Sequence, residues 1–224
     1  MADLTFNVLG STERLTLKEH ALVIAGFTGR NQAEVQQHID ELVAIGVPAP
    51  DTVPSFYVLD SALTTSAADI ETGGSNTSGE VEPVLIRHDG RLYLSVGSDH
   101  TDRDIERDSI AASKAACPKP VGASVLALPE RAGDFDWDSI TATSTVDGKL
   151  YQQGTLESLR PPMDVLKLYD QAHGDADGDV VLFGGTLPLI GGEFIPGTRW
   201  KISLGLPNGI ELEHSYSARV TTRS

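Results

Sequence analysis

The residues with the clearest potential for chemistry are three carboxylates, Glu80, Glu82 and Asp99. Carboxylate oxygens, together with water, suit hard divalent ions such as Mg²⁺, Mn²⁺ or Ca²⁺, and three of them leave coordination positions open for a substrate. A bound cation would also remove the repulsion between like charges that face one another across a strand pair. The alternative is that Glu80 and Glu82 decorate a solvated strand face, as most alternating acids do.

A predicted β-hairpin would bring these carboxylates together. The Asp-Gly pair at 89–90 is the strongest short hairpin signal in the sequence, and strands are expected on both sides of it. A two-residue turn fixes the register, so that Glu82 faces Gly97 and Glu80 faces Asp99. Directly opposed residues of an antiparallel pair lie on the same face, so the acids should converge at the open end of the hairpin. Gly97 is expected to leave room there for another group to approach the backbone.

Two sequence motifs contain these acids. Residues 80–82 have the form Glu-x-Glu, and residues 97–106 have the sequence Gly-Ser-Asp-His-Thr-Asp-Arg-Asp-Ile-Glu. They resemble the metal-binding Glu-x-Glu pair and the Gly-Asn-Asp-x-x-x-Arg-Asp-x-Gln block of the fumarylacetoacetate hydrolase superfamily. The resemblance places the three carboxylates on metal ligands and Arg103 on an arginine that faces the substrate.

Further segments follow the family pattern in the same order, from about residue 25 to 215. Residues 29–31 and 38–41 resemble a Gly-x-Asn-Tyr-x-x-His-x-x-Glu signature, and residues 48–56 resemble its Pro-rich continuation. Lys114 and residues 118–122 resemble the family's lysine and the segment that follows it. Residues 185–188 resemble a Gly-Thr-Pro-x-Gly loop, and residues 196–198 and 204–211 resemble a closing hairpin. The number and order of these matches make the resemblance specific. Ser98 in place of asparagine, Glu106 in place of glutamine and a missing tyrosine put the chain in a divergent branch.

The resemblance also assigns a general base. His38 and Glu41 are three residues apart on a predicted helix, so their side chains can touch, and a carboxylate beside an imidazole suits a base that deprotonates water. In the family such a pair sits on a mobile lid over the metal. Without the resemblance, the two residues would be a routine pair at the boundary of a helix surface.

Positive charge for the substrate would come from Lys114 and Arg103, which the resemblance directs to the substrate carboxylate and to a developing oxyanion. Without it, both would be exposed helix cations. Thr186, beside two glycines, could offer a hydroxyl and backbone N–H groups to a carboxylate, although Gly-Gly pairs also simply make turns. Glu106 could bind a water of the metal or reject an anion. Cys117 has no evident base partner, so a catalytic thiol is not expected.

The elements that must hold these residues are mainly strands. Besides the hairpin strands at 81–86 and 91–96, a second hairpin is predicted from strands at 140–146 and 150–156 around Asp147-Gly148. The apolar patterns predict further strands at 5–9, 21–25, 124–128, 180–183, 200–204 and 210–216. Helices are predicted at 31–46, 105–115 and 161–172, and the Ser-, Thr- and Gly-rich segment 66–79 is predicted to be a mobile loop. Strands and helices do not alternate, so a doubly wound parallel sheet is excluded.

The composition narrows the class of partner and the compartment. The 32 acidic residues outnumber the 17 basic ones, and the formal net charge of −15 argues against nucleic acid or an anionic membrane as the main partner. A single cysteine excludes an internal disulfide, and the N-terminal segment lacks the charged and apolar regions of a signal peptide. No apolar stretch is long enough to span a membrane, so a cytoplasmic protein is expected.

Residues 1–224 are therefore expected to form one α+β, mainly β, catalytic domain, with the His-x-x-Glu helix in 1–55 and a metal-binding β-rich core in 56–224. The resemblance implies a mixed β-roll or partly open barrel, usually a homodimer, with Mg²⁺, Mn²⁺ or Ca²⁺ as cofactor. It implies a hydrolase that cleaves a C–C bond in a small anionic 2-oxo acid or β-dicarbonyl acid. The alternatives are decarboxylation, dehydration or isomerisation at the same site, or a catalytically silent metal-binding β-domain.

Overall fold

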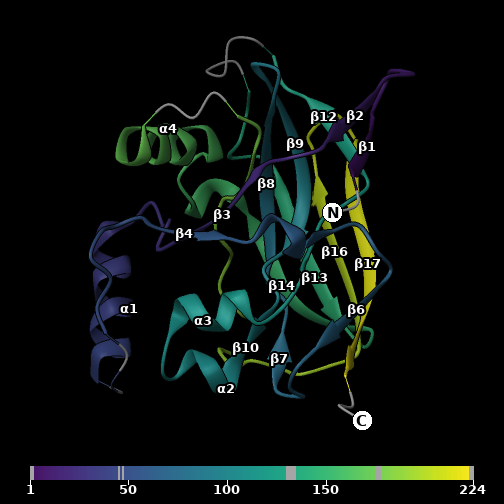
Figure 1. Cartoon of the computed structure of the whole chain (residues 1–224). Coiled ribbons are helices and arrows are strands. Elements are labelled where there is room, and N and C mark those ends of the chain that lie inside the picture. The colour runs from purple at the N-terminus through teal and green to yellow at the C-terminus, as the bar shows by residue number, and fades with distance from the viewer. Residues whose placement is uncertain (1–2, 45, 47, 130–134, 175–177, 222–224) are drawn as a thin grey trace.

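Strands are the main regular secondary structure of the computed structural model, which describes residues 3–44, 46, 48–129, 135–174 and 178–221 (Figure 1). Among these residues, the larger of two main sheets has eight strands. In spatial order they are β2 (Arg14–Leu17), β1 (Leu4–Val8), β12 (Ser124–Ala127), β9 (Arg91–Ser98), β8 (Val81–His88), β15 (Val180–Phe183), β3 (Ala21–Gly26) and β4 (Ser55–Leu59). The β8–β9 hairpin therefore lies at the centre of this sheet.

A second sheet and two short strand pairs complete the β structure of the described chain. The second sheet has the order β14 (Lys149–Thr155), β13 (Thr141–Val146), β16 (Arg199–Gly205), β17 (Glu211–Val220) and β6 (Asp69–Thr72). The short pairs are β10 (Thr101–Asp102) with β7 (Thr77–Ser78), and β11 (Lys119–Pro120) with β5 (Thr64–Thr65). Both main sheets are mixed, because β1–β12, β15–β3 and β17–β6 are parallel whereas the other neighbours are antiparallel.

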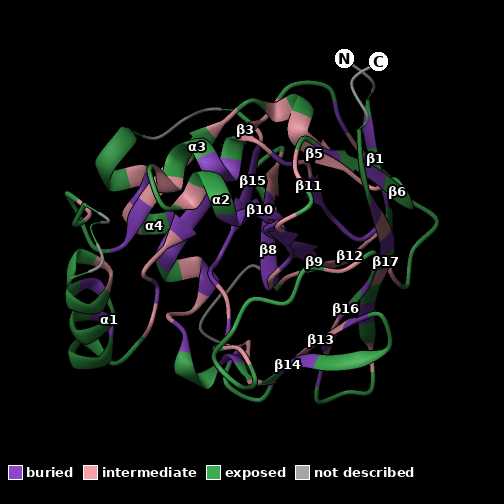
Figure 2. Ribbon diagram, turned by 90° about the horizontal axis from the view of Figure 1, so that it is seen from below, coloured by how far each residue is buried: buried purple, intermediate pink, exposed green. Residues whose placement is uncertain are grey.

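Both faces of the large sheet are buried. Leu85 of β8 contacts a core shared with Ile202 of the second sheet, whereas the next residue, Ile86, lies in another core with Phe6 of β1 and Ile24 of β3. Strands β1 and β3 are far apart in the order of the sheet, so the sheet must curl for these side chains to meet. Figure 2 shows the buried residues concentrated in the strands, while α1 is largely exposed.

The described helices lie around this β structure. They are α1 (Gln32–Ala44), α2 (Arg103–Glu106), α3 (Ile110–Ala115) and α4 (Pro162–His173), with 3₁₀ turns η1 (Ser61–Leu63) and η3 (Leu156–Ser158). Helix α1 begins after Asn31, whose Oδ1 accepts the N–H of Ala33 at 3.1 Å. Helix α4 buries Val165, Leu166 and Tyr169 in the core between the sheets. No described helix is long and apolar enough to cross a membrane.

The predicted fold class and the central hairpin are confirmed. The protein is mainly β with a few helices, and its large mixed sheet is curled in the manner of a partly open barrel. Strands β8 and β9 pair in the predicted register, with Glu82 opposite Gly97. Asp89 and Gly90 have φ values of 48° and 73°, the left-handed pair of a type I′ turn. The second predicted hairpin also forms, between β13 and β14.

Two local predictions were wrong. The segment 66–79 contains β6 and β7, which pair with β17 and β10, so it is not simply a loop. The predicted helix 105–115 is divided into α2 and α3, because Ser109 takes an extended conformation and its Oγ caps the second helix by accepting the N–H of Ala112 at 3.2 Å.

The expectation that Gly97 leaves open space is also corrected. A Cβ added there would lie 2.5 Å from both Phe183 Cε1 and Val84 Cγ2. The space beside this glycine is therefore filled by the apolar core and is not available to a ligand.

Candidate active site

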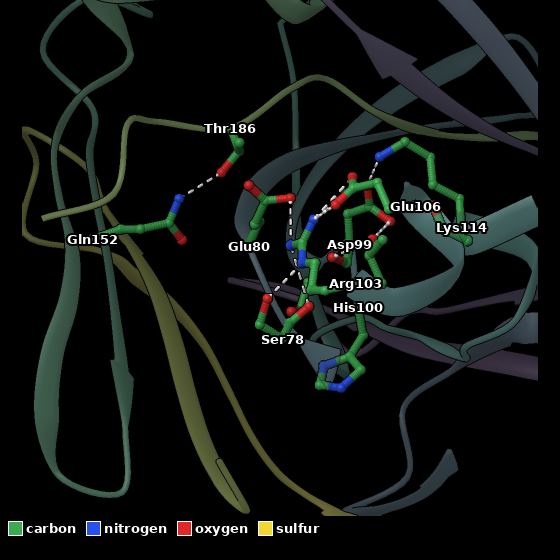
Figure 3. A network of polar contacts seen from close by, with 12 residues as sticks. Ser78, Glu80, Asp99, His100, Arg103, Glu106, Lys114, Gln152 and Thr186 are labelled. Carbon is green, nitrogen blue, oxygen red and sulfur yellow. Dashed lines mark hydrogen bonds and ion pairs between the residues drawn. The ribbon is translucent and has the colours of Figure 1, made fainter. Parts of the chain in front are cut away.

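Charged side chains from several segments of the chain meet at the open end of the β8–β9 hairpin (Figure 3). Glu82 lies on β8, Glu80 precedes that strand, and Asp99 follows β9. The N–H of Asp99 donates to the carbonyl oxygen of Glu80 at 3.0 Å, so the two chains stay paired one step beyond the ladder. Helices α2 and α3 bring Arg103 and Lys114 to the same place.

Asp99 is fully buried between two ammonium groups. Lys114 Nζ donates to Asp99 Oδ2, and Lys119 Nζ lies 3.2 Å from Oδ1. Burial alone would raise the pKa of Asp99, but Lys114 and then Lys119 bring it well below its usual value. Burial would likewise lower the pKa of Lys114, yet the charge of Asp99 raises it. The two groups are therefore a charged pair at neutral pH, and Lys114 is not an exposed helix cation.

Lys119 completes this cluster, although no motif singled it out. Its side chain has no exposed surface, and Nζ donates to the backbone carbonyls of His100, at 2.6 Å, and of Lys114. Burial lowers the pKa of Lys119 below its usual value. The residue holds the backbone after β9 against α3. Its only signal in the sequence is the pair of flanking prolines, which restrict the backbone but do not reveal burial.

Glu82 is a second buried carboxylate, 3% exposed. Its Oε2 accepts the N–H of Gly185 at 2.8 Å. Burial first, and then the negative charge of Asp99, raise the pKa of Glu82 well above its usual value, and Glu80 adds to the effect. The three predicted acids are therefore close enough to disfavour one another's charge, and a cation between them would relieve this repulsion.

Arg103 ties Glu80 to α2. Its Nη2 lies 3.0 Å from Glu80 Oε2, and its Nη1 donates to both carboxylate oxygens of Glu106, at 2.9 and 3.1 Å. Its Nε donates to Ser78 Oγ at 2.7 Å, a contact that the sequence did not predict. Burial would lower the pKa of Arg103, but the carboxylates of Glu80 and Glu106 raise it.

Thr186 lies at the edge of the cluster with its hydroxyl already in use. Its Oγ1 donates to the carbonyl oxygen of Val81 at 2.9 Å and accepts from Gln152 Nε2 at 2.8 Å (Figure 3). Its predicted role as a substrate ligand would have to compete with both bonds. The preceding backbone N–H, that of Gly185, serves Glu82 instead.

His38 and Glu41 are not brought together. Both are exposed on α1, and Glu41 Oε1 accepts from Gln37 Nε2 at 2.9 Å. The His38 ring centroid lies 6.2 Å from that of Phe27. In Figure 1, α1 stands to one side of α2 and α3. The role of His38 and Glu41 as a catalytic pair stays a prediction that requires α1 to move.

A second buried polar network, also unpredicted, adjoins Asp99. His100 has no exposed surface, its Nδ1 lies 3.0 Å from Tyr216 Oη, and its Nε2 lies 3.0 Å from Thr77 Oγ1. Tyr216 Oη lies 2.7 Å from Ser98 Oγ. Burial lowers the pKa of His100 to about 3, so the ring is neutral. The serine that departs from the resembled motif therefore belongs to a network that joins β9 to β17.

The carboxylates have the donor chemistry of a site for a hard divalent ion, but they do not form a complete ligand set in the described conformation. Among the residues described, no group of three or more His, Cys, Asp or Glu side chains is arranged to hold a metal ion. The reason lies in the ion pairs, since Arg103 holds Glu80 and Lys114 holds Asp99. The negative charge of Glu82 is disfavoured by burial and by the neighbouring acids, and a bound cation would relieve this unfavourable charge. The carboxylate oxygens of these acids are the kind of ligand that a hard divalent ion prefers.

An open cavity of about 310 Å³ lies near the cluster, and none of its described lining residues belongs to the charged cluster itself. Tyr57 lines it, and the centroid of the Tyr57 ring lies 5.8 Å from Lys114 Nζ. The remaining walls come from the segment 48–56 and from residues 108–111 at the start of α3. This volume suits a small organic acid.

Comparison with known proteins identifies the family of the chain and solved structures of similar fold. A family model described as "Protein of unknown function (DUF2848)" matches residues 25–216. No curated protein matches the chain. Similar solved structures include fumarylpyruvate hydrolase from Pseudomonas aeruginosa in complex with Mn²⁺ and pyruvate, which is 14% identical with a TM-score of 0.66, over 99% of this chain and 97% of that one.

Two other similar structures have different activities in their names. One is 5-carboxymethyl-2-hydroxymuconate delta-isomerase from Mycobacterium smegmatis, 13% identical with a TM-score of 0.62, over 92% of this chain and 79% of that one. The other is 2-keto-3-deoxyarabinonate dehydratase, 13% identical with a TM-score of 0.60, over 91% of this chain and 75% of that one. At these identities the likeness shows the fold. It confirms the fold-level resemblance to fumarylacetoacetate hydrolase proteins, which similar structures from Oleispira antarctica and Yersinia pestis carry in their names.

Proposed function

The chain belongs to the family described as "Protein of unknown function (DUF2848)", and from that premise and its fold we propose that it is a divalent-metal-dependent enzyme that hydrolyses a C–C bond in a small 2-oxo acid or β-dicarbonyl acid. The observation that carries the proposal is the buried cluster of Glu82, Asp99 and Lys114. In it, charged groups are withdrawn from water and their pKa values are strongly shifted. Such clusters are concentrated at functional sites.

In this proposal Glu80, Glu82 and Asp99 hold Mg²⁺, Mn²⁺ or Ca²⁺, and Mg²⁺ is the expected ion. When bound, the ion supplies Lewis-acid stabilisation of negative charge on the substrate's oxygens. Lys114 keeps its charge because of Asp99, so it can bind a substrate carboxylate or oxyanion beside the Tyr57 wall of the cavity. Arg103 fixes the position of Glu80.

The proposed base is His38, oriented by Glu41. Both side chains are exposed on α1, so closure of α1 over the cluster has to precede proton transfer. As part of the same proposal, the protein acts in the cytoplasm as a homodimer on a small anionic substrate. Its net charge of −15 is consistent with a partner that is neither nucleic acid nor membrane.

A second candidate is an isomerase, dehydratase or decarboxylase acting on the same class of oxo acid. The observation that favours it is the absence, among the described residues, of a hydrogen-bonded His38–Glu41 pair. Exchange of solvent deuterium into the position next to the substrate carbonyl, without bond cleavage, would identify this class.

The first prediction concerns the metal. Thermal unfolding of the metal-stripped protein should shift upward with Mg²⁺, Mn²⁺ or Ca²⁺, because an ion that binds only the native state stabilises it by about 2.7 kcal/mol at a hundredfold excess over its Kd. Glu82→Gln should abolish the shift. Because Glu82 is buried and its charge is disfavoured, this neutral isostere should leave the metal-free protein about as stable as the wild type.

Two further variants complete the test. Asp99→Asn should also abolish the shift, but it leaves Lys114 and Lys119 without their carboxylate and should destabilise the metal-free protein. Asp164→Asn, which changes an exposed acid on α4, should keep the full shift. A metal-dependent shift of equal size in Glu82→Gln and wild type would refute the ligand assignment. No shift with any ion would support a catalytically silent β-domain.

A further inference from the structure

Arg103 has no hydrogen-bond donor left for a substrate. A guanidinium carries five N–H groups. The single N–H of Nε goes to Ser78 Oγ at 2.7 Å, and Nη1 serves both oxygens of Glu106 at 2.9 and 3.1 Å. Nη2 contacts Glu80 Oε2 at 3.0 Å and the carbonyl oxygen of Ser78 at 3.5 Å. All three nitrogens are thus engaged by groups of the chain itself.

One face of the guanidinium is covered as well. The ring of Phe194, from the segment between β15 and β16, lies over Arg103, with Cζ 3.6 Å from the ring centroid. Arg103 itself is only 6% exposed. Edge and face together withdraw this cation from incoming anions, and Glu106 occupies with two oxygens the place that a substrate carboxylate would take.

The other cations of the described cluster are engaged in a comparable way. Lys119 is fully buried and contacts Asp99 and two backbone carbonyls. Lys114 pairs with Asp99 but is 8% exposed and faces Tyr57, so it can share its charge with one substrate carboxylate. With a divalent ion bound, the site can therefore neutralise one carboxylate beside a carbonyl, and it has no cation left for a second.

The neighbouring cavity also favours a substrate with a single carboxylate. Its walls include the apolar or aromatic side chains of Phe56, Tyr57 and Ile110, and two acids, Asp51 and Asp108. Among its described lining residues there is no Lys, Arg or His. A carboxylate placed there would meet like charges and apolar groups, whereas an uncharged tail would bury apolar surface.

From these contacts we infer that the substrate is a monoanionic oxo acid with an uncharged, largely apolar tail, and that Glu106 rejects substrates with a second carboxylate. The inference rests on the proposed function, since it assumes that the carboxylate cluster binds an oxo acid. Glu106 is a specificity-determining residue here. Its own carboxylate occupies Arg103, so Arg103 cannot bind the second carboxylate of a dicarboxylic substrate.

A matched pair of inert ligands tests this inference through binding, independently of turnover. The acids 2-oxopentanoate and 2-oxoglutarate have the same number of carbons, and they differ only in a terminal methyl group or carboxylate. Isothermal titration of the full chain in the presence of Mn²⁺ should show at least about tenfold tighter binding of 2-oxopentanoate. Glu106→Gln should reduce that ratio to near one or invert it, because Arg103 then has donors for the second carboxylate.

The control is Asp104→Asn, which removes the same charge from an exposed position of α2 and should leave the ratio unchanged. Tighter binding of 2-oxoglutarate by the wild type, or an unchanged ratio in Glu106→Gln, would overturn the inference while leaving the oxo-acid site intact. Preferential binding of 2-oxopentanoate without cleavage of any 2,4-dioxo acid would support the inference and count against the hydrolase. Binding of neither acid would overturn both proposals.

Discussion

At the scale of the residue, burial decides which charged groups matter. Lys119 looks like an ordinary lysine between two prolines, and lysines are rarely buried. In the structure it is enclosed completely, and its Nζ shares Asp99 with Lys114. The environment that shifts these pKa values is assembled from β9, α3 and β11, so the sequence around any one of the residues does not reveal it.

Cys117 provides a pH-dependent prediction at this scale. Burial raises the pKa of its thiol to about 11. Because the folded state holds the proton more tightly than the unfolded state, the stabilisation is complete below about pH 9 and is lost as the pH rises toward 11. The free energy of unfolding should therefore fall by about 1.4 kcal/mol more per pH unit in the wild type than in Cys117→Ala across that window. Urea unfolding between pH 8 and 10.5 measures the two slopes, and parallel slopes would contradict the prediction.

At the scale of the element, local rules predicted what local interactions determine. The two Asp-Gly turns have the positive φ values of type I′ turns, and each produced the expected hairpin. Strands β6 and β7 were missed because they are short segments within a Ser- and Gly-rich stretch, and they become strands only by pairing with β17 and β10. The segment 105–115 was predicted as one helix because helix propensity alone does not show where a helix is interrupted. At Ser109, the side chain caps a new helix instead of continuing the old one.

Gly97 gives the prediction for an element. Gly97→Ala on β9 would bring a methyl group to 2.5 Å from Phe183 and Val84, so core and strand must shift. We expect a loss of about 1–3 kcal/mol in unfolding free energy, the usual cost of overpacking a core. Gly73→Ala is the control, since an added Cβ there meets nothing within 4 Å. Chemical denaturation of both variants measures the difference, and equal stability would show that the core near Phe183 adapts without cost.

At the scale of the whole molecule, Gln152 joins the two sheets. From β14 its Oε1 accepts the N–H of Val81, at the start of β8, at 2.9 Å and the hydroxyl of Ser144 at 3.0 Å. Its Nε2 donates to Thr186 Oγ1 and to the carbonyl oxygen of Leu187, at 2.8 and 2.7 Å. Because Val81 lies between Glu80 and Glu82, this amide fixes the acidic end of the hairpin to the second sheet.

Removal of this amide should therefore be costly. Gln152→Ala leaves the buried N–H of Val81 and carbonyl of Leu187 without a partner, and each unsatisfied group costs about 1–3 kcal/mol. We expect a total loss of roughly 2–4 kcal/mol and weaker metal binding. Gln153→Ala changes the adjacent, exposed residue and should cost little. Denaturation and metal titration of both variants provide the comparison, and an equal effect of the two substitutions would rule out a special role for Gln152.

The candidate site was predictable as far as one hairpin reaches. The convergence of Glu80, Glu82 and Asp99 follows from alternation and turn type, and the structure brings these acids together. Gln152 and Tyr216 were not predictable, because they reach the hairpin from a different sheet. The His38–Glu41 pairing followed from helical spacing, but that spacing does not exclude the competing partner that Glu41 takes within the same helix.

The contact of Tyr216 with Ser98 and His100 has a consequence for the order in which the protein is made. Residues 80–114, which hold most of the charged cluster, leave the ribosome about a hundred residues before Tyr216 does. Until then the polar groups behind Asp99 lack their partner, and the second sheet lacks β17. A nascent chain therefore carries the acids of the cluster well before it can hold them in place.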